Sequence, residues 1–324
     1  MEILIVKTLI AFLYKRIVLL SPYIEIRIRQ FYWKYVKQLR KYKPYGHKGV
    51  SNKYIQKIDF GTIIGYLKEN GIGEGSLLVV HSSYDVLECT GLSPDEIINK
   101  LLELVGQTGT LAMPVIRKYK GEPKTEDILS FNTDDLVCIY NVKKTVVTSG
   151  ILPYLMMQRN DSIISHHPLN PMVAIGPLAE DMMKNNLYGD NPSPHGQNSS
   201  WKFCLDHDAF VIGLGVDLEH YNTISHVAEE AFDDWKWSND DWFRLRKFDI
   251  IDENKNTRRI IVSERKPQWG MLHYAEIRVN RDLNKASIIK RFKIKDDIII
   301  CIEKSQELIS FLRSKNKNGY PYFK

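Results

Sequence analysis

Hydrophobic runs and helical spacings along the chain predict alternating strands and helices. Residues 76–81 form a short apolar run typical of a buried strand, and residues 110–116 form a second one. Between them, residues 93–96 (Ser-Pro-Asp-Glu) carry a helix-start signature, and apolar residues follow at helical spacing to Val105. A strand, a helix and a strand at this spacing predict a right-handed crossover between two parallel strands.

The same pattern continues through the rest of the chain. Helices are predicted at residues 59–70, 148–158, 177–184, 222–232 and 305–315, and strands at residues 174–175, 208–216 and 297–302. Residues 243–251 and 257–264 flank a polar turn and predict a β-hairpin, whereas the polar stretch 117–141 predicts a long irregular loop. The expected class is α/β, with a mostly parallel central sheet flanked by helices, an added antiparallel β-hairpin region and a basic N-terminal helical arm. The expected division is an arm over residues 1–50 and one large domain over residues 51–324.

The charge of the chain is concentrated at its beginning. The 324 residues carry a net charge of +6, from 45 Lys and Arg against 39 Asp and Glu. Residues 1–48 hold 11 Lys and Arg and 2 Asp and Glu, so they carry +9 and leave −3 for the remainder. The body therefore lacks the basic surface of a nucleic-acid-binding protein, and no nucleic-acid partner is expected.

The first 45 residues combine apolar, aromatic and basic side chains. Lys7, Lys15 and Arg16 interrupt the apolar stretch, which argues against a membrane-spanning helix, and no cleavage site typical of a signal peptide follows. Two interpretations remain open: a helix that contacts an anionic membrane surface, or an arm that packs on the body or on a second subunit. The expected location is cytoplasmic, with peripheral contact at the inner face of the membrane as a further possibility. A homodimer is also possible.

Cysteine and histidine spacing give no sign of a metal site. The four cysteines, Cys89, Cys138, Cys204 and Cys301, show neither a paired spacing nor a disulfide framework, which favours a reducing compartment. The adjacent residues at 166–167 (His-His) would point in opposite directions on a strand and make poor joint ligands. We expect no metal, and no phosphate-loop or dinucleotide-binding motif is present.

The most informative segment follows the apolar run at residues 208–216. A glycine-containing strand end leads into a polar loop and then into a predicted helix that carries Thr223, His226 and Glu229 at three-residue intervals. Ligands bind at the carboxyl ends of parallel strands, and a histidine beside a carboxylate is the arrangement that removes a proton from an attacking group. Spacing alone leaves open the alternative that His226 is a structural histidine that only pairs with Glu229.

A second candidate lies at the end of the first apolar strand. His81 is its last residue, and Ser82 and Ser83 follow directly. Their hydroxyl and backbone N–H groups are suited to hold a phosphate. Paired serines are also common in simple turns, so this motif alone is a weak signal.

Together these segments resemble the aminoglycoside 3-N-acetyltransferase family, over residues 55 to 235. The resemblance rests on residues 77–83 (LLVVHSS) with 109–114 (GTLAMP), on His167-Pro168 with Gly176, and on the block Asn222-Thr223-x-x-His226-x-Ala228-Glu229. Residues 148–153 and 199–201 also resemble family segments, whereas Ile164 and Pro171 depart from the family pattern.

The resemblance implies an acetyl-CoA-dependent N-acetyltransferase without an acyl-enzyme intermediate. His226 would be the general base, Glu229 its orienting carboxylate, and Thr223 a donor to the developing oxyanion. The resemblance further implies two sets of binding residues. For the cofactor these are His81, Ser82, Ser83, Ser149 and Thr223, and for the acceptor they are His167, Asp217 and Glu230.

The sequence favours one acceptor among several. The basic arm and the weakly acidic body favour an amino sugar carried on a nucleotide, in surface-polysaccharide synthesis, over a polycationic drug. One alternative is an aminoglycoside acetyltransferase that confers antibiotic resistance. Another is a non-catalytic, membrane-associated assembly protein that kept the fold, although the complete Thr223, His226 and Glu229 set argues against it.

Overall fold

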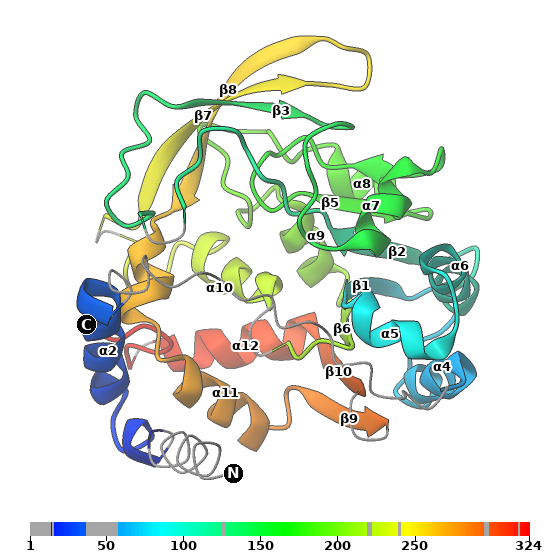
Figure 1. Ribbon diagram of the computed structural model, residues 1–324, viewed down its shortest axis with the longest axis horizontal. Coiled ribbons are helices and arrows are strands. Elements are labelled where there is room, and N and C mark those ends of the chain that lie inside the picture. Colours follow the sequence, from blue (N-terminus) through cyan, green and yellow to red (C-terminus); the bar gives the residue numbers. More distant parts are fainter. Residues whose placement is uncertain are drawn as a thin grey trace.

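The computed structural model contains one seven-stranded sheet with helices on both of its faces and a second, three-stranded sheet (Figure 1). It describes residues 14, 16–36, 58–124, 127–218, 222–238, 241–294, 298–316 and 318–324. The large sheet has the strand order β4-β5-β2-β1-β6-β10-β9. Its strands are β1 (Leu77–Ser82), β2 (Thr110–Pro114), β4 (Ile163–Ile164), β5 (Met172–Ile175), β6 (Phe210–Leu214), β9 (Lys290–Ile294) and β10 (Ile298–Lys304).

The centre of this sheet is parallel and its flanks are antiparallel. Strand β1 pairs in parallel with β2 on one side and with β6 on the other, as the strand–helix–strand pattern predicts. The pairs β2–β5, β4–β5, β6–β10 and β9–β10 are antiparallel. The α/β class is confirmed, and the parallel centre brings the carboxyl ends of β1, β2 and β6 to one edge of the sheet.

Alternating side chains of β1 divide the hydrophobic core between the two faces of the sheet. Leu78 and Val80 lie in one buried cluster, and Leu77 and Val79 lie in the other, because successive residues of a strand point to opposite faces. Helices cover both faces. They are α4 (Phe60–Glu69), α5 (Tyr84–Leu87), α6 (Pro94–Val105), α7 (Ile151–Gln158), α8 (Ala179–Met183), α9 (Ser200–Asp206), α11 (Glu276–Lys285) and α12 (Ser305–Asn316).

The predicted hairpin is confirmed, and it belongs to the smaller sheet. Strands β7 (Phe243–Ile251) and β8 (Thr257–Arg265) pair antiparallel along their whole length, and β3 (Val137–Asn141) adds to β7 in parallel. The prediction of an irregular loop over residues 117–141 is therefore wrong at its end. Since β3 finds its partner about a hundred residues later in the chain, no local pattern could reveal it.

Two predicted helices differ in the structure. The helix expected at residues 148–158 begins only at Ile151. Ser149 and Thr148 donate instead to the carbonyl groups of Pro114, the last residue of β2, and of Ile116. The helix expected at residues 222–232 is a 3-10 turn, η3 (Thr223–His226), followed by a single α-helical turn, α10 (Val227–Glu230).

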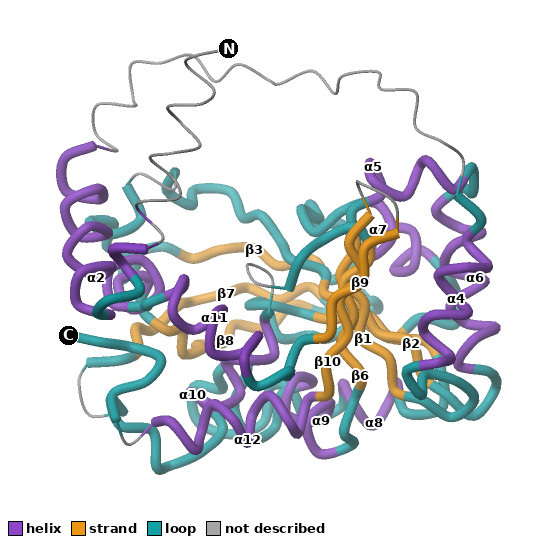
Figure 2. Tube along the Cα trace, turned by 90° about the horizontal axis from the view of Figure 1, so that it is seen from below, coloured by secondary structure: helices purple, strands orange, loops and turns teal. Residues whose placement is uncertain are grey.

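The described part of the N-terminal arm is a helix that packs on the body. Helix α2 (Pro22–Phe31) continues into the π-helical turn η1 (Tyr32–Val36) and lies near α11, with the carboxyl end of the chain beside it in both views (Figures 1 and 2). Ile26 is buried, and Glu25 accepts a hydrogen bond from the backbone N–H of Ile277 at 3.1 Å. This contact satisfies an N–H group in the first turn of α11. The predictions for residues 1–13 and 37–57 lie outside the described residues.

Within the described ranges, no helix is both long enough and apolar enough to span a bilayer.

The packing of α6 generates a stability prediction. Leu101 is fully buried in the core, whereas the next residue, Leu102, is only partly buried. Leu101→Ala should lower the free energy of unfolding by about 2 to 5 kcal/mol because it leaves a cavity in a closely packed interior. Leu102→Ala, the matched control, should cost clearly less. Urea denaturation of both variants measures the difference, and equal losses would contradict this orientation of α6.

Candidate active site

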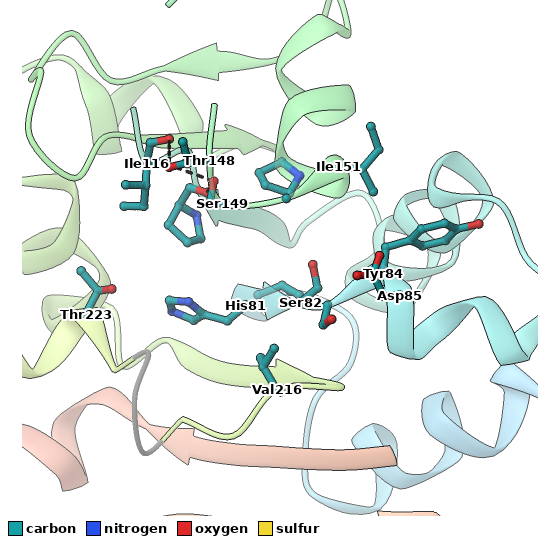
Figure 3. A pocket seen from close by; sticks show the side chains of 15 residues that line it. His81, Ser82, Tyr84, Asp85, Ile116, Thr148, Ser149, Ile151, Val216 and Thr223 are labelled. Atoms are coloured by element: carbon teal, nitrogen blue, oxygen red, sulfur yellow. Dashed lines mark hydrogen bonds between the residues drawn. The ribbon is translucent and has the colours of Figure 1, made fainter. Parts of the chain in front are cut away.

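A pocket of about 520 Å³ lies at the carboxyl ends of β1 and β2, and we call it the strand-end pocket. Figure 3 shows Thr148 and Ser149 on one side of it, His81 and Ser82 on the other, and Thr223 at one end. The residues that line it are Val80, His81, Ser82, Ser83, Tyr84, Asp85, Pro114, Ile116, Thr148, Ser149, Gly150, Ile151, Pro153, Val216 and Thr223. The structure therefore brings together all five residues that the sequence assigns to the cofactor.

The wall of this pocket formed by residues 148–153 is suited to a negatively charged group. Gly150 has a φ of 111°, which favours glycine, and it is the N-cap of α7 without a side-chain hydrogen bond to the helix. The first N–H groups of a helix carry partial positive charge when no side chain caps them. The amino-terminal end of α7 thus offers this charge beside the hydroxyl groups of Ser82 and Ser149.

His81 is a neutral member of the pocket wall. It is buried, its ring stacks on that of Trp201 with centroids 6.3 Å apart, and burial lowers its pKa to about 4. Among the described residues its Nε2 has no hydrogen-bond partner. At neutral pH His81 therefore offers a hydrogen-bonding nitrogen and no charge.

A second pocket, of about 400 Å³, adjoins the first, and we call it the histidine pocket. Thr223 and Ile116 line both pockets, so the two meet at these residues. The residues around the histidine pocket are Arg29, Ile116, Asn170, Asn222, Thr223, Ser225, His226, Arg265, Gly270, Tyr274, Glu276 and Tyr322. Thr223, the first residue of the 3-10 turn η3, thus lies where the two pockets meet.

The position of η3 depends on β10, the antiparallel neighbour of β6 in the sheet. Asn222, which precedes the turn, donates to the buried carboxyl group of Glu303 on β10 at 2.9 Å. Ser225 donates to the carbonyl oxygen of Asn222 at 2.6 Å and closes the turn. Burial raises the pKa of Glu303 to about 8, although the hydrogen bond from Asn222 opposes this shift. The turn is therefore tied to β10.

His226 and Glu229 form a hydrogen-bonded pair, as their spacing predicts. The His226 Nδ1 and Glu229 Oε2 atoms are 2.9 Å apart, and Arg265 Nη2 lies 3.2 Å from His226 Nε2. Because a guanidinium group only donates, Nε2 accepts this hydrogen bond and Nδ1 carries the proton that is donated to Glu229. His226 is therefore a neutral imidazole whose basic nitrogen, Nε2, accepts from Arg265, and both residues line the histidine pocket.

The charges around this pair keep it in that state. Burial and the Arg265 guanidinium lower the pKa of His226, while Glu229 opposes them. Burial would raise the pKa of Glu229, but Arg265 and His226 hold it at about 2. Arg265 Nη1 lies 3.0 Å from Glu229 Oε2, and the Tyr322 hydroxyl donates to Glu229 Oε1 at 2.8 Å. The carboxylate is thus ionised and fully engaged.

A second histidine–carboxylate pair lies directly behind the first. His195 Nδ1 is 3.1 Å from Glu230 Oε1, both side chains are buried, and the His195 ring is 5.1 Å from that of His226. The other ring nitrogen of His195 is 3.2 Å from the side-chain nitrogen of Asn170, which lines the histidine pocket. This pair holds Asn170 in place.

The three residues that the sequence assigns to the acceptor line neither pocket. Both ring nitrogens of His167 contact backbone carbonyl groups, Asp217 pairs with Arg291 at 3.0 Å, and Glu230 pairs with His195. All three engage neighbouring parts of the protein, and their assignment to the acceptor stays a prediction.

Residues that the sequence did not suggest line the histidine pocket. Arg265 and Tyr322 reach the pocket from β8 and from the carboxyl-terminal segment, beyond the residues that carry the resemblance. Arg29 reaches it from the arm. No spacing rule connects such distant residues, so the sequence held no signal for them. Among the described residues, no three His, Cys, Asp or Glu side chains are grouped as a metal ion requires.

Comparisons with known proteins agree with this architecture. A family model described as aminoglycoside 3-N-acetyltransferase matches residues 79–314. The chain is 25% identical over 175 residues to aminoglycoside N(3)-acetyltransferase IX of Micromonospora chalcea, and 26% identical over 165 residues to aminoglycoside N(3)-acetyltransferase III of Serratia marcescens. These matches cover 52% and 49% of this chain, and 60% and 59% of the two relatives. The chain thus spans only about 60% of the length of the curated relatives it matches.

Solved structures share the fold over a longer stretch. The structure of aminoglycoside acetyltransferase AAC(3)-IIb superposes with a TM-score of 0.64 at 17% identity, over 82% of this chain and 98% of that one. The binary complex of AAC-IIIb with CoASH superposes with a TM-score of 0.60 at 16% identity. This match covers 81% of this chain and 97% of that one. At such low identity the likeness establishes the fold alone.

The charges around His226 generate a prediction on its titration. Arg265→Gln should raise the pKa of His226, because it removes a positive charge that disfavours the imidazolium ion. Glu229→Gln should lower the same pKa, because it removes the carboxylate that favours that ion. Nuclear magnetic resonance of isotope-labelled histidine measures both values. Shifts in the same direction in the two variants would show that Arg265 and Glu229 do not set the protonation of His226.

Proposed function

The chain belongs to the aminoglycoside 3-N-acetyltransferase family, and we propose that it transfers an acetyl group from acetyl-CoA to an amine of an amino sugar. The observation that supports this most strongly is the junction of two pockets at Thr223, with the His226–Glu229 pair on one side of it. A group-transfer enzyme needs a donor site and an acceptor site that share one reacting point.

The strand-end pocket is the proposed donor site. Its serine hydroxyl groups and the amino-terminal end of α7 suit the phosphates of CoA, and the five residues predicted for the cofactor all line it. Thr223 lies where this pocket meets the next, so its hydroxyl group is placed to donate to the oxygen of the thioester as negative charge develops there.

The histidine pocket is the proposed acceptor site. His226 Nε2 accepts a proton from the acceptor ammonium group, and the ionised Glu229 stabilises the imidazolium ion that forms. The Arg265 hydrogen bond to Nε2 gives way to the acceptor in this step. The amine nitrogen then bonds to the thioester carbon and releases its second surplus proton to solvent. The carbon–sulfur bond breaks, and CoA leaves as the thiol with the proton returned from His226.

The relatives bear on the choice of acceptor. Their names describe acetylation of aminoglycosides, which supports the alternative drawn from the sequence. Neither the relatives nor the solved structures support synthesis of surface polysaccharides, the acceptor context that the sequence favoured. An aminoglycoside-type amino sugar is therefore the proposed acceptor class.

Peripheral contact with a membrane is a further proposal for the arm. Phe31 and Tyr35 are exposed by 59% and 48%, their rings lie 5.0 Å apart, and the Lys34 ammonium group is 5.1 Å from the Tyr35 ring. Exposed aromatic rings beside a cation suit the interface of an anionic bilayer.

Removal of the proposed base generates the central prediction. His226→Ala should reduce kcat with acetyl-CoA and an amino-sugar acceptor by about 100-fold or more, because general base catalysis contributes this much. Release of CoA thiol measures turnover, and the thermal shift caused by CoA should stay unchanged because His226 lies outside the strand-end pocket. His207→Gln, a variant of an exposed histidine outside both pockets, is the control. Full turnover by His226→Ala would exclude His226 as the base.

The membrane proposal has its own test. Phe31→Ser combined with Tyr35→Ser should abolish sedimentation of the protein with vesicles that contain phosphatidylserine, because it removes the exposed rings. Vesicles of phosphatidylcholine alone are the control for charge dependence. Unchanged sedimentation of the double variant, or none by the unaltered protein, would refute the proposal.

A further inference from the structure

Asn170 is a residue of the histidine pocket that is fixed from two directions. Its backbone carbonyl group accepts a hydrogen bond from the Trp201 indole at 2.9 Å, and its side-chain nitrogen lies 3.2 Å from His195 Nε2. Asn170 has a φ of 45°, a left-handed conformation that asparagine adopts more readily than most residues. Both the backbone and the side chain of Asn170 are therefore held in place.

The orientation of the Asn170 amide group follows from the buried carboxylate of Glu230. Burial would raise the pKa of Glu230, but His195 lowers it below its usual value, so the group is ionised. It faces His195 Nδ1 at 3.1 Å and accepts from the His195 backbone N–H at 3.2 Å. A ring nitrogen beside an ionised carboxylate carries the proton, which leaves the lone pair on Nε2. The Asn170 amide nitrogen therefore donates to Nε2.

This orientation leaves the side-chain oxygen of Asn170 for a ligand. No donor contacts this oxygen among the residues that the structure describes, and the side chain is only partly buried. Asn170 lines the histidine pocket, whereas His195 does not. The His195 ring is 5.1 Å from that of His226, so the Asn170 amide lies near the proposed base. An amide oxygen accepts hydrogen bonds from hydroxyl and ammonium groups, and an amino sugar carries both.

We propose that Asn170 is an acceptor-binding residue, whose side-chain oxygen accepts a hydrogen bond from a hydroxyl or ammonium group of the amino sugar near the reacting amine. His195 is a positioning residue, because it acts on the acceptor only through the Asn170 amide. This inference rests on the proposed function and adds a binding residue to its acceptor site. It suits an acceptor of the aminoglycoside type, which carries many such donor groups. An amide that is fixed before binding loses little freedom when the acceptor enters.

Removal of the Asn170 side chain tests the proposal. Asn170→Gly tolerates the left-handed backbone, and it should raise both KM and Kd for sisomicin by about threefold to tenfold because one hydrogen bond is lost. The value of kcat should change little, since the bond is present before and during the reaction. The thermal shift caused by CoA should stay unchanged because Asn170 does not line the strand-end pocket. Asn185→Gly, a variant of an exposed asparagine outside both pockets, is the control.

Two variants of His195 separate positioning of the amide from general packing. Both glutamine and asparagine can donate and accept, but the amide of glutamine reaches the place of Nε2, whereas that of asparagine reaches only the place of Nδ1. His195→Gln should therefore keep the contact with Asn170 and the Kd for sisomicin. His195→Asn should raise this Kd by about as much as Asn170→Gly does. The double variant should bind no more weakly than Asn170→Gly, because both changes act on the same hydrogen bond to the acceptor.

Calorimetry and turnover distinguish failure of this inference from failure of the proposed function. An unchanged Kd in Asn170→Gly, or absence of sisomicin binding by the unaltered protein, would overturn the role of Asn170. Equal losses in His195→Gln and His195→Asn, or additive losses in the double variant, would overturn the positioning role of His195. Sisomicin binding that weakens in Asn170→Gly, without acetyl transfer by the unaltered protein, would instead refute the proposed function and support the binding role of Asn170.

Discussion

The candidate active site depends on the contacts that the buried carboxylate of Glu229 makes with three other side chains. An ionised group in the protein interior is costly unless charged and hydrogen-bonding partners surround it. Here the partners come from three parts of the chain: His226 from η3, Arg265 from the end of β8, and Tyr322 from the carboxyl-terminal segment. One carboxylate therefore joins the central sheet's polar edge to the smaller sheet and to the end of the chain.

Hydrophobic packing supports this network from behind. Tyr322 is buried among four tryptophans, two of which are Trp242 and Trp269, in a cluster separate from the two cores of the central sheet. Aromatic rings in edge-to-face contact bury much area and fix the direction of a polar group at their edge. The Tyr322 hydroxyl is thereby held toward Glu229, and the carboxylate in turn keeps His226 in one tautomer.

The location of the two pockets follows from the topology of the sheet. Parallel strands place their carboxyl ends together, and the chain leaves each of them through a loop that faces the same space. His81 and Ser82 end β1, and Thr223 follows β6. Ser149 bonds to the last residue of β2, and Thr148 bonds to Ile116 just after it. The arm then completes the second pocket from the opposite side with Arg29. The strand-end pocket is thus lined only by residues within the family match, whereas the lining of the histidine pocket includes Arg29 from outside it.

Local sequence determined the elements whose signals are short in range. Apolar runs predicted strands β1 and β6, and capping residues marked the start of α6. Helical spacing predicted the pairing of His226 with Glu229. Tertiary structure alone decided which distant residues complete the site. Strand β3 depends on β7 for its hydrogen bonds, Arg265 and Tyr322 reach Glu229 only through folding, and His167 and Asp217 turn to other partners. The reason is physical: hydrogen bonds along a helix link neighbours in sequence, whereas pairing of strands and of buried charges links residues that sequence spacing does not relate.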